Sequence, residues 1–181
     1  MKVLAFAATS SSKSINKQLA SYATSLLDGV ETEILDINDY ELPLFSEDKE
    51  HELGQPALAK QFLNKIAASD ALVVSFAEHN GSYTAAYKNI FDWASRINPK
   101  VFQAKPMVML STSPGPGGAS SVLATAVNSA PFFDGYVKAS LSVPSFYENF
   151  DAENFVIRND KLLSELEASM QQLLKQSVEV A

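Results

Sequence analysis

The chain has 181 residues, the size of one domain with a full hydrophobic core, and 46% of them are apolar and 19% charged, as in most globular proteins. It contains no cysteine, which excludes a disulfide framework, a thiol nucleophile and a cysteine-ligated metal site. The formal net charge at pH 7 is −7, without a cluster of Lys and Arg. We therefore expect no nucleic-acid partner and no attraction to anionic membranes.

The N-terminal sequence MKVLAFAATSS has the apolar character of a buried strand. It carries one basic residue, and its apolar run is shorter than the ~7–15 residues of a signal peptide. No stretch of the chain approaches the ~18 consecutive apolar residues of a membrane span. We therefore expect a cytoplasmic protein, and the lack of cysteine agrees with a reducing compartment.

Short apolar runs alternate with helical patterns along the whole chain. The apolar runs predict strands at residues 2–8, 31–37, 71–76, 107–110 and 136–143. Apolar side chains at helical spacing predict helices at residues 15–26, 58–66, 83–97, 119–130 and 162–173. The segment 38–56, with two prolines and many charges, is expected to be irregular.

This alternation predicts an α/β fold: a doubly wound, five-stranded parallel sheet with helices on both faces, in one domain spanning residues 1–181. Such sheets bind ligands outside the carboxyl ends of their strands, near the point where the strand order reverses. The loops after the first, third and fourth strands are therefore the candidate site.

The first of these loops, residues 9–14, reads TSSSKS and precedes a predicted helix. Helix N-termini carry unpaired N–H groups and a partial positive charge, and small hydroxyl side chains add further donors, so the loop is suited to a phosphate. The alternative is one capping serine among surface residues. The glycines of a P-loop and of a dinucleotide fingerprint are missing, which favours a terminal monophosphate over a pyrophosphate.

The second loop, residues 77–82, reads AEHNGS and follows an uncharged strand. Asn80 and Gly81 predict a tight turn, since both tolerate a positive φ, and the main-chain amides there can face a flat heterocycle. The alternative is a plain turn with Ser82 as a helix N-cap. His79 is a candidate general base or metal ligand, but the second histidine, His51, lies in the segment expected to be irregular, so we predict no metal site.

The third loop, residues 111–118, reads STSPGPGG. Its three glycines allow a ligand to approach the main chain closely, whereas the alternative is a stiff connecting turn. Because all three loops follow strand ends at one edge of the sheet, we expect them to converge.

The three loops resemble those of the NAD(P)H-dependent FMN reductases of the flavodoxin-like fold, which include quinone, azo and chromate reductases. The first loop of that family reads G-S-x-R-x-x-S-x-N, and residues 8–16 read ATSSSKSIN. Its second loop reads P-E-Y-N-G-S and is followed by K-N and D-W, whereas residues 77–95 read AEHNGSYTAAYKNIFDWAS. The similarity extends from residue 1 to about residue 145.

The resemblance implies a flavodoxin-like strand order of 2-1-3-4-5 and FMN as the bound cofactor, with NADPH or NADH as the reductant. It implies that the FMN phosphate lies at the first loop and the isoalloxazine ring at the other two. The cofactor-binding residues would be Thr9, Ser11, Ser14, Ile15, Asn16, Ala77, Glu78, His79, Asn80, Gly81, Ser113, Pro114 and Gly115.

The chemistry of such an enzyme belongs to the flavin, which takes a hydride from NAD(P)H and passes electrons to a small acceptor such as a quinone, an azo compound or free flavin. We therefore expect no catalytic residue of the protein's own. Members of the family commonly form dimers or tetramers, so the resemblance also implies a homodimer or homotetramer.

The sequence departs from the family pattern within the first two loops. Ala8 replaces a glycine, Ser11 an arginine, Ala77 a proline and His79 a tyrosine. The lack of the arginine leaves the choice between NADH and NADPH open.

Two other functions stay open at this stage. One is a flavodoxin-like electron carrier with a protein redox partner, in which Tyr83 and Phe45 would supply the aromatic side chains that flank the flavin. The other is a phosphate-binding α/β domain without flavin.

Overall fold

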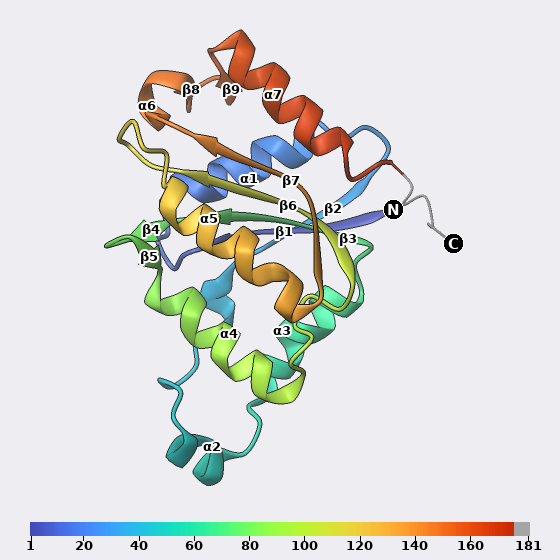
Figure 1. Cartoon of the computed structure of the whole chain (residues 1–181), viewed down its shortest axis with the longest axis vertical. Coiled ribbons are helices and arrows are strands. Elements are labelled where there is room, and N and C mark those ends of the chain that lie inside the picture. Colours follow the sequence, from blue (N-terminus) through green and yellow to red (C-terminus); the bar gives the residue numbers. More distant parts are fainter. Residues whose placement is uncertain (176–181) are drawn as a thin grey trace.

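A computed structural model of the protein, which describes residues 1–175, shows one main sheet between two layers of helices (Figure 1). The strands lie in the order β2-β1-β3-β6-β7, and every neighbouring pair is parallel. Counted along the chain, this is the order 2-1-3-4-5, so the predicted flavodoxin-like α/β fold is confirmed. The strands are β1 (Lys2–Ala8), β2 (Glu31–Leu35), β3 (Ala71–Phe76), β6 (Lys105–Thr112) and β7 (Gly135–Val143).

Helices cover both faces of this sheet because side chains alternate along each strand. In β1, Leu4 and Phe6 point into the core beneath α3 (Ala57–Ala67), α4 (Ala85–Ile97) and α5 (Ser120–Ser129). Val3 and Ala5 point into the opposite core, beneath α1 (Ile15–Ser25) and α7 (Asp160–Gln171). Burial on two faces explains why β1 and β3 read as continuous apolar runs rather than as alternating ones.

The segment expected to be irregular contains two short helices, so that prediction was wrong. The second strand ends at Leu35, where the Asp36 carboxylate accepts a hydrogen bond from Asn38 N and begins the 3₁₀ helix η1 (Ile37–Tyr40). Further on, α2 (Glu47–Leu53) begins at the N-cap Ser46 and has no buried residue. Its sequence EDKEHEL carries no apolar stripe, which is why helical spacing did not reveal it.

The helix predicted from Tyr83 begins two residues later. Thr84 is its N-cap: the hydroxyl accepts from Tyr87 N and donates to Ala8 O, so it joins α4 to the end of β1. Tyr83 itself lies in β5 (Ser82–Tyr83), which pairs antiparallel with β4 (Glu78–His79). Ser82 is therefore in a hairpin and does not cap the helix.

The chain beyond β7 completes the face that α1 and α7 cover. Its short elements are α6 (Phe146–Asn149) and a hairpin of β8 (Phe150–Asp151) and β9 (Val156–Ile157). The Phe150 ring packs edge-on against Tyr22 of α1, with ring centres 5.6 Å apart. On the opposite face, the 3₁₀ helix η2 (Ala130–Phe133) leads from α5 into β7.

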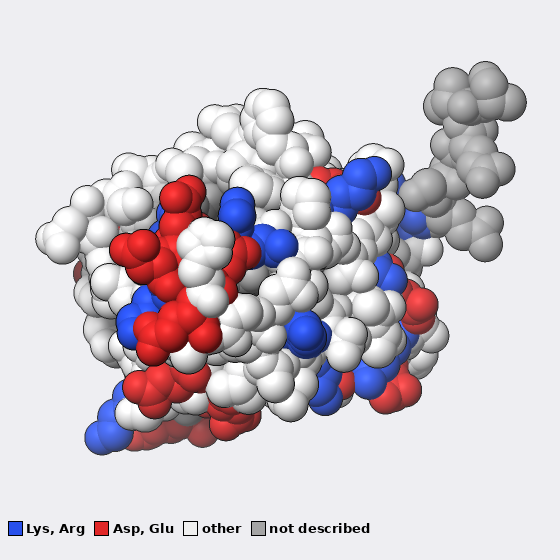
Figure 2. Space-filling view, turned by 90° about the horizontal axis from the view of Figure 1, so that it is seen from below, with Lys and Arg blue, Asp and Glu red and all other residues white. Residues whose placement is uncertain are grey.

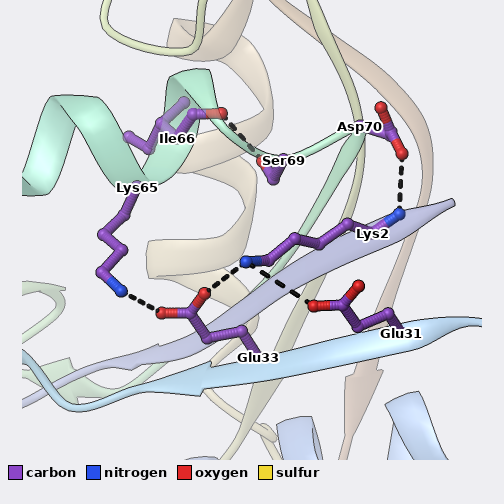
Figure 3. A network of polar contacts seen from close by, with 7 residues as sticks. All are labelled: Lys2, Glu31, Glu33, Lys65, Ile66, Ser69 and Asp70. Atoms are coloured by element: carbon purple, nitrogen blue, oxygen red, sulfur yellow. Dashed lines mark hydrogen bonds and ion pairs between the residues drawn. The ribbon is translucent and has the colours of Figure 1, made fainter.

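Charged side chains lie apart from the core. Figure 2 shows the end of the molecule at which α2 lies, where acidic side chains gather and Lys and Arg are scattered. At the amino ends of β1 and β2, Glu33 binds both Lys2 and Lys65, at 2.9 and 2.6 Å, and so joins two strands to α3 (Figure 3). None of the helices within residues 1–175 combines the length and the apolar character needed to cross a lipid bilayer.

Candidate functional site

A pocket of about 200 Å³ lies at the carboxyl ends of β1, β3 and β6, where the three predicted loops meet. The order of the sheet reverses between β1 and β3, so this is the expected place for a ligand. The lining residues are Thr9, Ser11, Lys13, Ser14, Ile15, Asn16, Ala77, Glu78, His79, Thr112, Ser113, Pro114 and Tyr147.

One end of the pocket is built from hydrogen-bond donors at the start of α1. Ser14 is the N-cap of this helix, and its Oγ accepts from Lys17 N at 3.1 Å, which leaves the hydroxyl proton free to donate elsewhere. The N–H groups of Ile15 and Asn16 belong to the first turn, where helical geometry provides no acceptor. Together with the Lys13 ammonium, these groups have the chemistry that suits an anion.

Thr9 and Ser11 shape the loop on the other side of this end. Thr9 is buried, and its Oγ1 accepts from Ser11 N at 3.3 Å and lies 3.4 Å from the Ser11 hydroxyl. This side-chain-to-main-chain contact fixes the turn of the loop between the two residues.

The side chain of Asn16 has a structural role that the sequence did not reveal. It is buried, its Oδ1 accepts from Ser75 Oγ and Thr112 N, and its Nδ2 donates to Thr112 O. These contacts tie α1 to β3 and β6. What Asn16 can offer a phosphate is therefore its main-chain N–H, since its amide is already in use.

The second loop is the tight hairpin between β4 and β5. Asn80 and Gly81 both have positive φ, 53° and 77°, as the predicted turn requires. Ala77, Glu78 and His79 line the pocket, whereas Asn80 and Gly81 form the hairpin tip and do not line it.

Glu78 joins the second loop to the third. Its Oε2 accepts from Val122 N at 2.8 Å, in the first turn of α5, a helix whose own N-cap residue is Ala119 and supplies no side-chain cap. A carboxylate is favoured at a helix N-terminus, so the contact stabilises α5 while fixing the wall of the pocket.

In the third loop, Ser113 and Pro114 line the pocket, and Gly115 faces the chain beyond β7. The Gly115 carbonyl accepts from Ser113 Oγ and from Ser145 N. Gly118 is the glycine that the loop requires, since its φ is 58° and a Cβ atom would lie 2.3 Å from Ser142 Oγ.

Tyr147 of α6 also lines the pocket, although no local pattern of the sequence indicated it. The residue is 66% exposed, and α6 follows β7 along the chain. The two aromatic residues considered as flavin flanks lie elsewhere. Phe45 packs edge-on against Trp93, with ring centres 5.1 Å apart, and Tyr83 lines a different pocket.

The chemistry of the lining fits FMN. Hydroxyl and N–H donors with one lysine suit the phosphate, and loop main chain with Tyr147 suits a flat ring system. Glu78 is the one carboxylate among the described lining residues, and it is bound to Val122 N. Within residues 1–175, no group of three or more His, Cys, Asp or Glu side chains is placed to hold a metal ion.

Fold and pocket together define a flavodoxin-like protein with a pocket lined by hydrogen-bond donors at the start of its first helix. The sequence profile of the family described as NADPH-dependent FMN reductase matches residues 1–147. The chain belongs to this family.

Known relatives agree with the assignment. An NAD(P)H-dependent FMN reductase of Pseudomonas aeruginosa is 30% identical over 96% of this chain and 93% of its own. A 2-hydroxy-1,4-benzoquinone reductase of a Burkholderia species is 36% identical, over 56% and 55% of the two chains. The structure of FerB, a flavoenzyme NAD(P)H:(acceptor) oxidoreductase from Paracoccus denitrificans, superimposes with a TM-score of 0.79 at 24% identity, covering 96% of this chain and 94% of FerB.

The prediction of an FMN-dependent oxidoreductase that uses NAD(P)H is therefore confirmed at the level of the family. The family is one of reductases, which decides against the electron carrier and against the domain without flavin.

Proposed function

We propose that this protein passes electrons from NAD(P)H, through FMN held in the pocket of the three loops, to a small quinone or azo acceptor. The observation that carries the proposal is the convergence of donors from the start of α1 with the main chain of two other loops in one pocket. The benzoquinone reductase named above supports a quinone as the acceptor.

The residues proposed to hold FMN divide between its two ends. The phosphate would be bound by the hydroxyls of Thr9, Ser11 and Ser14 and by the N–H groups of Ile15 and Asn16, with Lys13 nearby. The ring would lie against Ala77, Glu78, His79, Ser113 and Pro114, with Tyr147 flanking it. Asn80, Gly81 and Gly115 belong to the same two loops but do not line the pocket, so they would support the ring indirectly.

FMN supplies the redox chemistry when bound, because it accepts a hydride and then gives up electrons. The work of the chain is to hold the phosphate, orient the ring and leave one side of it open to reductant and acceptor. This needs no acid or nucleophile from the protein, in keeping with a lining of hydroxyls, amides and one bound carboxylate.

We also propose that the protein forms a homodimer or homotetramer. Several large apolar side chains are exposed although they could pack in an interface: Leu44 at 79%, Phe132 at 84%, Tyr136 at 57% and Tyr147 at 66%. Light scattering after size-exclusion chromatography should give a mass of twice or four times 19.6 kDa. A mass of one chain at micromolar concentration would contradict this.

The whole chain is proposed to work as one flavin-binding unit in the cytoplasm. The two apolar cores pack on opposite faces of the same sheet and include residues from Val3 to Leu173, which supports a single unit. The lack of cysteine agrees with a reducing compartment. Fractionation of cells that produce the untagged protein, probed with an antibody, tests the location.

The experiment for the proposed function is anaerobic spectroscopy of the purified protein mixed with FMN and desalted. We expect retained flavin absorbance that bleaches on addition of NADPH or NADH and returns on addition of benzoquinone. Retained colour that neither nucleotide bleaches would favour an electron carrier. If FMN does not bind in an equilibrium titration, the pocket is not its site.

A further inference from the structure

A second pocket, of about 140 Å³, lies between α4 and α5 on the face of the sheet away from α1. Within the described part of the chain it shares no lining residue with the proposed flavin pocket. It is lined by Phe76, Tyr83, Tyr87, Lys88, Phe91, Asp92, Ser95, Phe102, Met109, Ala126, Ser129 and Phe133.

The walls of this pocket are mainly aromatic. Tyr87 is in contact with Tyr83 and Phe91, at centre-to-centre distances of 5.3 and 5.7 Å, and Phe91 meets Phe133 edge-on at 4.7 Å. A cavity of about 150 Å³ with an apolar lining holds one benzene molecule, so this pocket has room for one ring and not for the three rings of a flavin.

One hydrogen-bonding pair lies within the lining. The hydroxyls of Tyr83 and Ser129 are 3.2 Å apart, and Ser129 Oγ is also 3.1 Å from the carbonyl oxygen of Ala126. A carbonyl can only accept, so the single Ser129 proton is used there, and Tyr83 must donate to Ser129. The Tyr83 oxygen then keeps its lone pairs for a donor from a ligand.

Apart from the hydroxyls of the two tyrosines, the polar groups of the lining are already paired. Lys88 Nζ binds the Asp92 carboxylate at 2.6 Å, and Ser95 Oγ donates to the main-chain oxygen of Asp92. Burial raises the pKa of both Tyr83 and Tyr87, which keeps their hydroxyls neutral at ordinary pH. The pocket therefore offers an apolar space for one ring and a neutral acceptor, without a free charge to bind an ion.

We propose that this pocket is a second small-molecule site, which takes a single-ring aromatic compound that carries a hydroxyl or amino donor, such as a phenol or an aniline. The ring would pack among Tyr87, Phe91 and Phe133, and the donor would bind the Tyr83 oxygen. Neither contact involves the flavin pocket, so the two sites can be occupied together.

Fluorine NMR titrations of the full-length protein with 4-fluorophenol and 4-fluoroanisole test this proposal. The two probes have similar rings, but the anisole lacks the donor. We expect the phenol to bind about fivefold more tightly, the effect of one hydrogen bond. Equal affinities, or no binding of the phenol, would overturn the proposal.

Two variants and one control locate the site. Tyr83→Phe should remove the preference for the phenol over the anisole. Ser129→Leu, which fills part of the pocket, should weaken the binding of both probes at least tenfold. Leu53→Ala, at an exposed side chain of α2 that does not line the pocket, should change neither. Circular dichroism verifies that each variant is folded, and a Tyr83→Phe protein that keeps the full preference would overturn the assignment.

A titration in the presence of FMN separates the two pockets. Saturating FMN should leave the affinity for 4-fluorophenol unchanged, whereas displacement of the phenol by FMN would assign its binding to the flavin pocket and overturn the proposal. The titrations without FMN remain decisive even if the protein were to fail to bind flavin.

Discussion

At the scale of single residues, the candidate site depends on side chains that serve the fold and the ligand together. Asn16 stands at the start of α1 and lines the pocket, yet its side-chain amide holds β3 and β6, which leaves its main-chain N–H for a ligand. Ser14 caps the same helix and keeps a proton for a ligand. Substitutions at these positions should therefore separate stability from binding.

Asn16→Ala should destabilise the protein strongly. The substitution leaves the Ser75 hydroxyl and both main-chain groups of Thr112 without their partner in a buried place. We expect the free energy of unfolding to fall by about 3 kcal/mol, measured by urea denaturation. Asn64→Ala, on an exposed position of α3, is the matched control and should change it by no more than ~0.5 kcal/mol. Similar losses of unfolding free energy in both variants would contradict the structural role assigned to Asn16.

Ser14→Ala should weaken FMN binding by ~1–2 kcal/mol, since a hydrogen bond to the charged phosphate is lost. Ser14→Asp is the more specific test of the phosphate site, because aspartate keeps the hydrogen bond to Lys17 N that caps the helix but places a negative charge beside the phosphate. We expect a loss in affinity larger than that of the alanine variant, measured by fluorescence titration, with a nearly unchanged unfolding midpoint.

The control for a lost helix cap is Ser46→Ala, since Ser46 caps α2 in the same way and does not line the pocket. This variant should bind FMN like the natural protein. If Ser14→Asp also did so, Ser14 would not lie at the phosphate.

At the scale of elements, the hairpin β4–β5 is the link between the pocket and α5. Its Asn80-Gly81 turn places Glu78 so that the carboxylate supplies the cap that α5 lacks. The contact spans 44 residues of sequence. It holds the second loop against the first turn of the helix that follows the third loop.

Glu78→Ala should lower the free energy of unfolding by about 1.5–3 kcal/mol, because Val122 N loses a charged acceptor. Glu78→Gln keeps an acceptor oxygen and should lose about half as much. The amide hydrogen of Val122 should exchange with solvent faster in the alanine variant. Glu167→Ala, at an exposed position of α7, is the control, and an unaffected Val122 amide would contradict the capping contact.

At the scale of the whole molecule, ion pairs join elements around the sheet. The Lys65 and Lys2 ammonium groups hold the pKa of the Glu33 carboxyl below its usual value of 4.5, and Asn154 and Arg158 lower that of Asp151 to about 2. Both carboxyls therefore bind fewer protons in the folded state than in the unfolded one. Their stabilising effect is present above pH 4.5 and is lost as the pH falls through the lowered pKa values.

Glu33→Gln should lower the melting temperature at pH 7, and its difference from the natural protein should shrink as the pH is lowered from 4.5 toward 3. The pairs are partly exposed, so the effect should be small and should also diminish in 1 M salt. Calorimetry across this pH range measures it, with Glu167→Gln as the control. If the melting temperatures of Glu33→Gln and the natural protein differed by the same amount at every pH, Glu33 would not contribute to stability through its lowered pKa.

The sequence by itself determined the strands, the main helices and the loops in which the pocket lies. Its local signals were strong: continuous apolar runs for β1 and β3, apolar stripes for α1, α3 and α4, and an Asn-Gly turn for the hairpin. Apolar periodicity is a property of neighbouring residues, so it can be read without the fold. The helix α2 escaped because it buries no side chain.

Only the tertiary structure decided which side chains meet. The side-chain partners of Asn16 are 59 and 96 residues away along the chain. Tyr147 lines the flavin pocket although it follows the last strand of the sheet, and Tyr83 lines the second pocket instead. Such contacts depend on how whole elements pack. No local pattern encodes a partner that is distant along the chain, because the apolar pattern of a segment specifies its period and buried face and leaves its neighbour undefined.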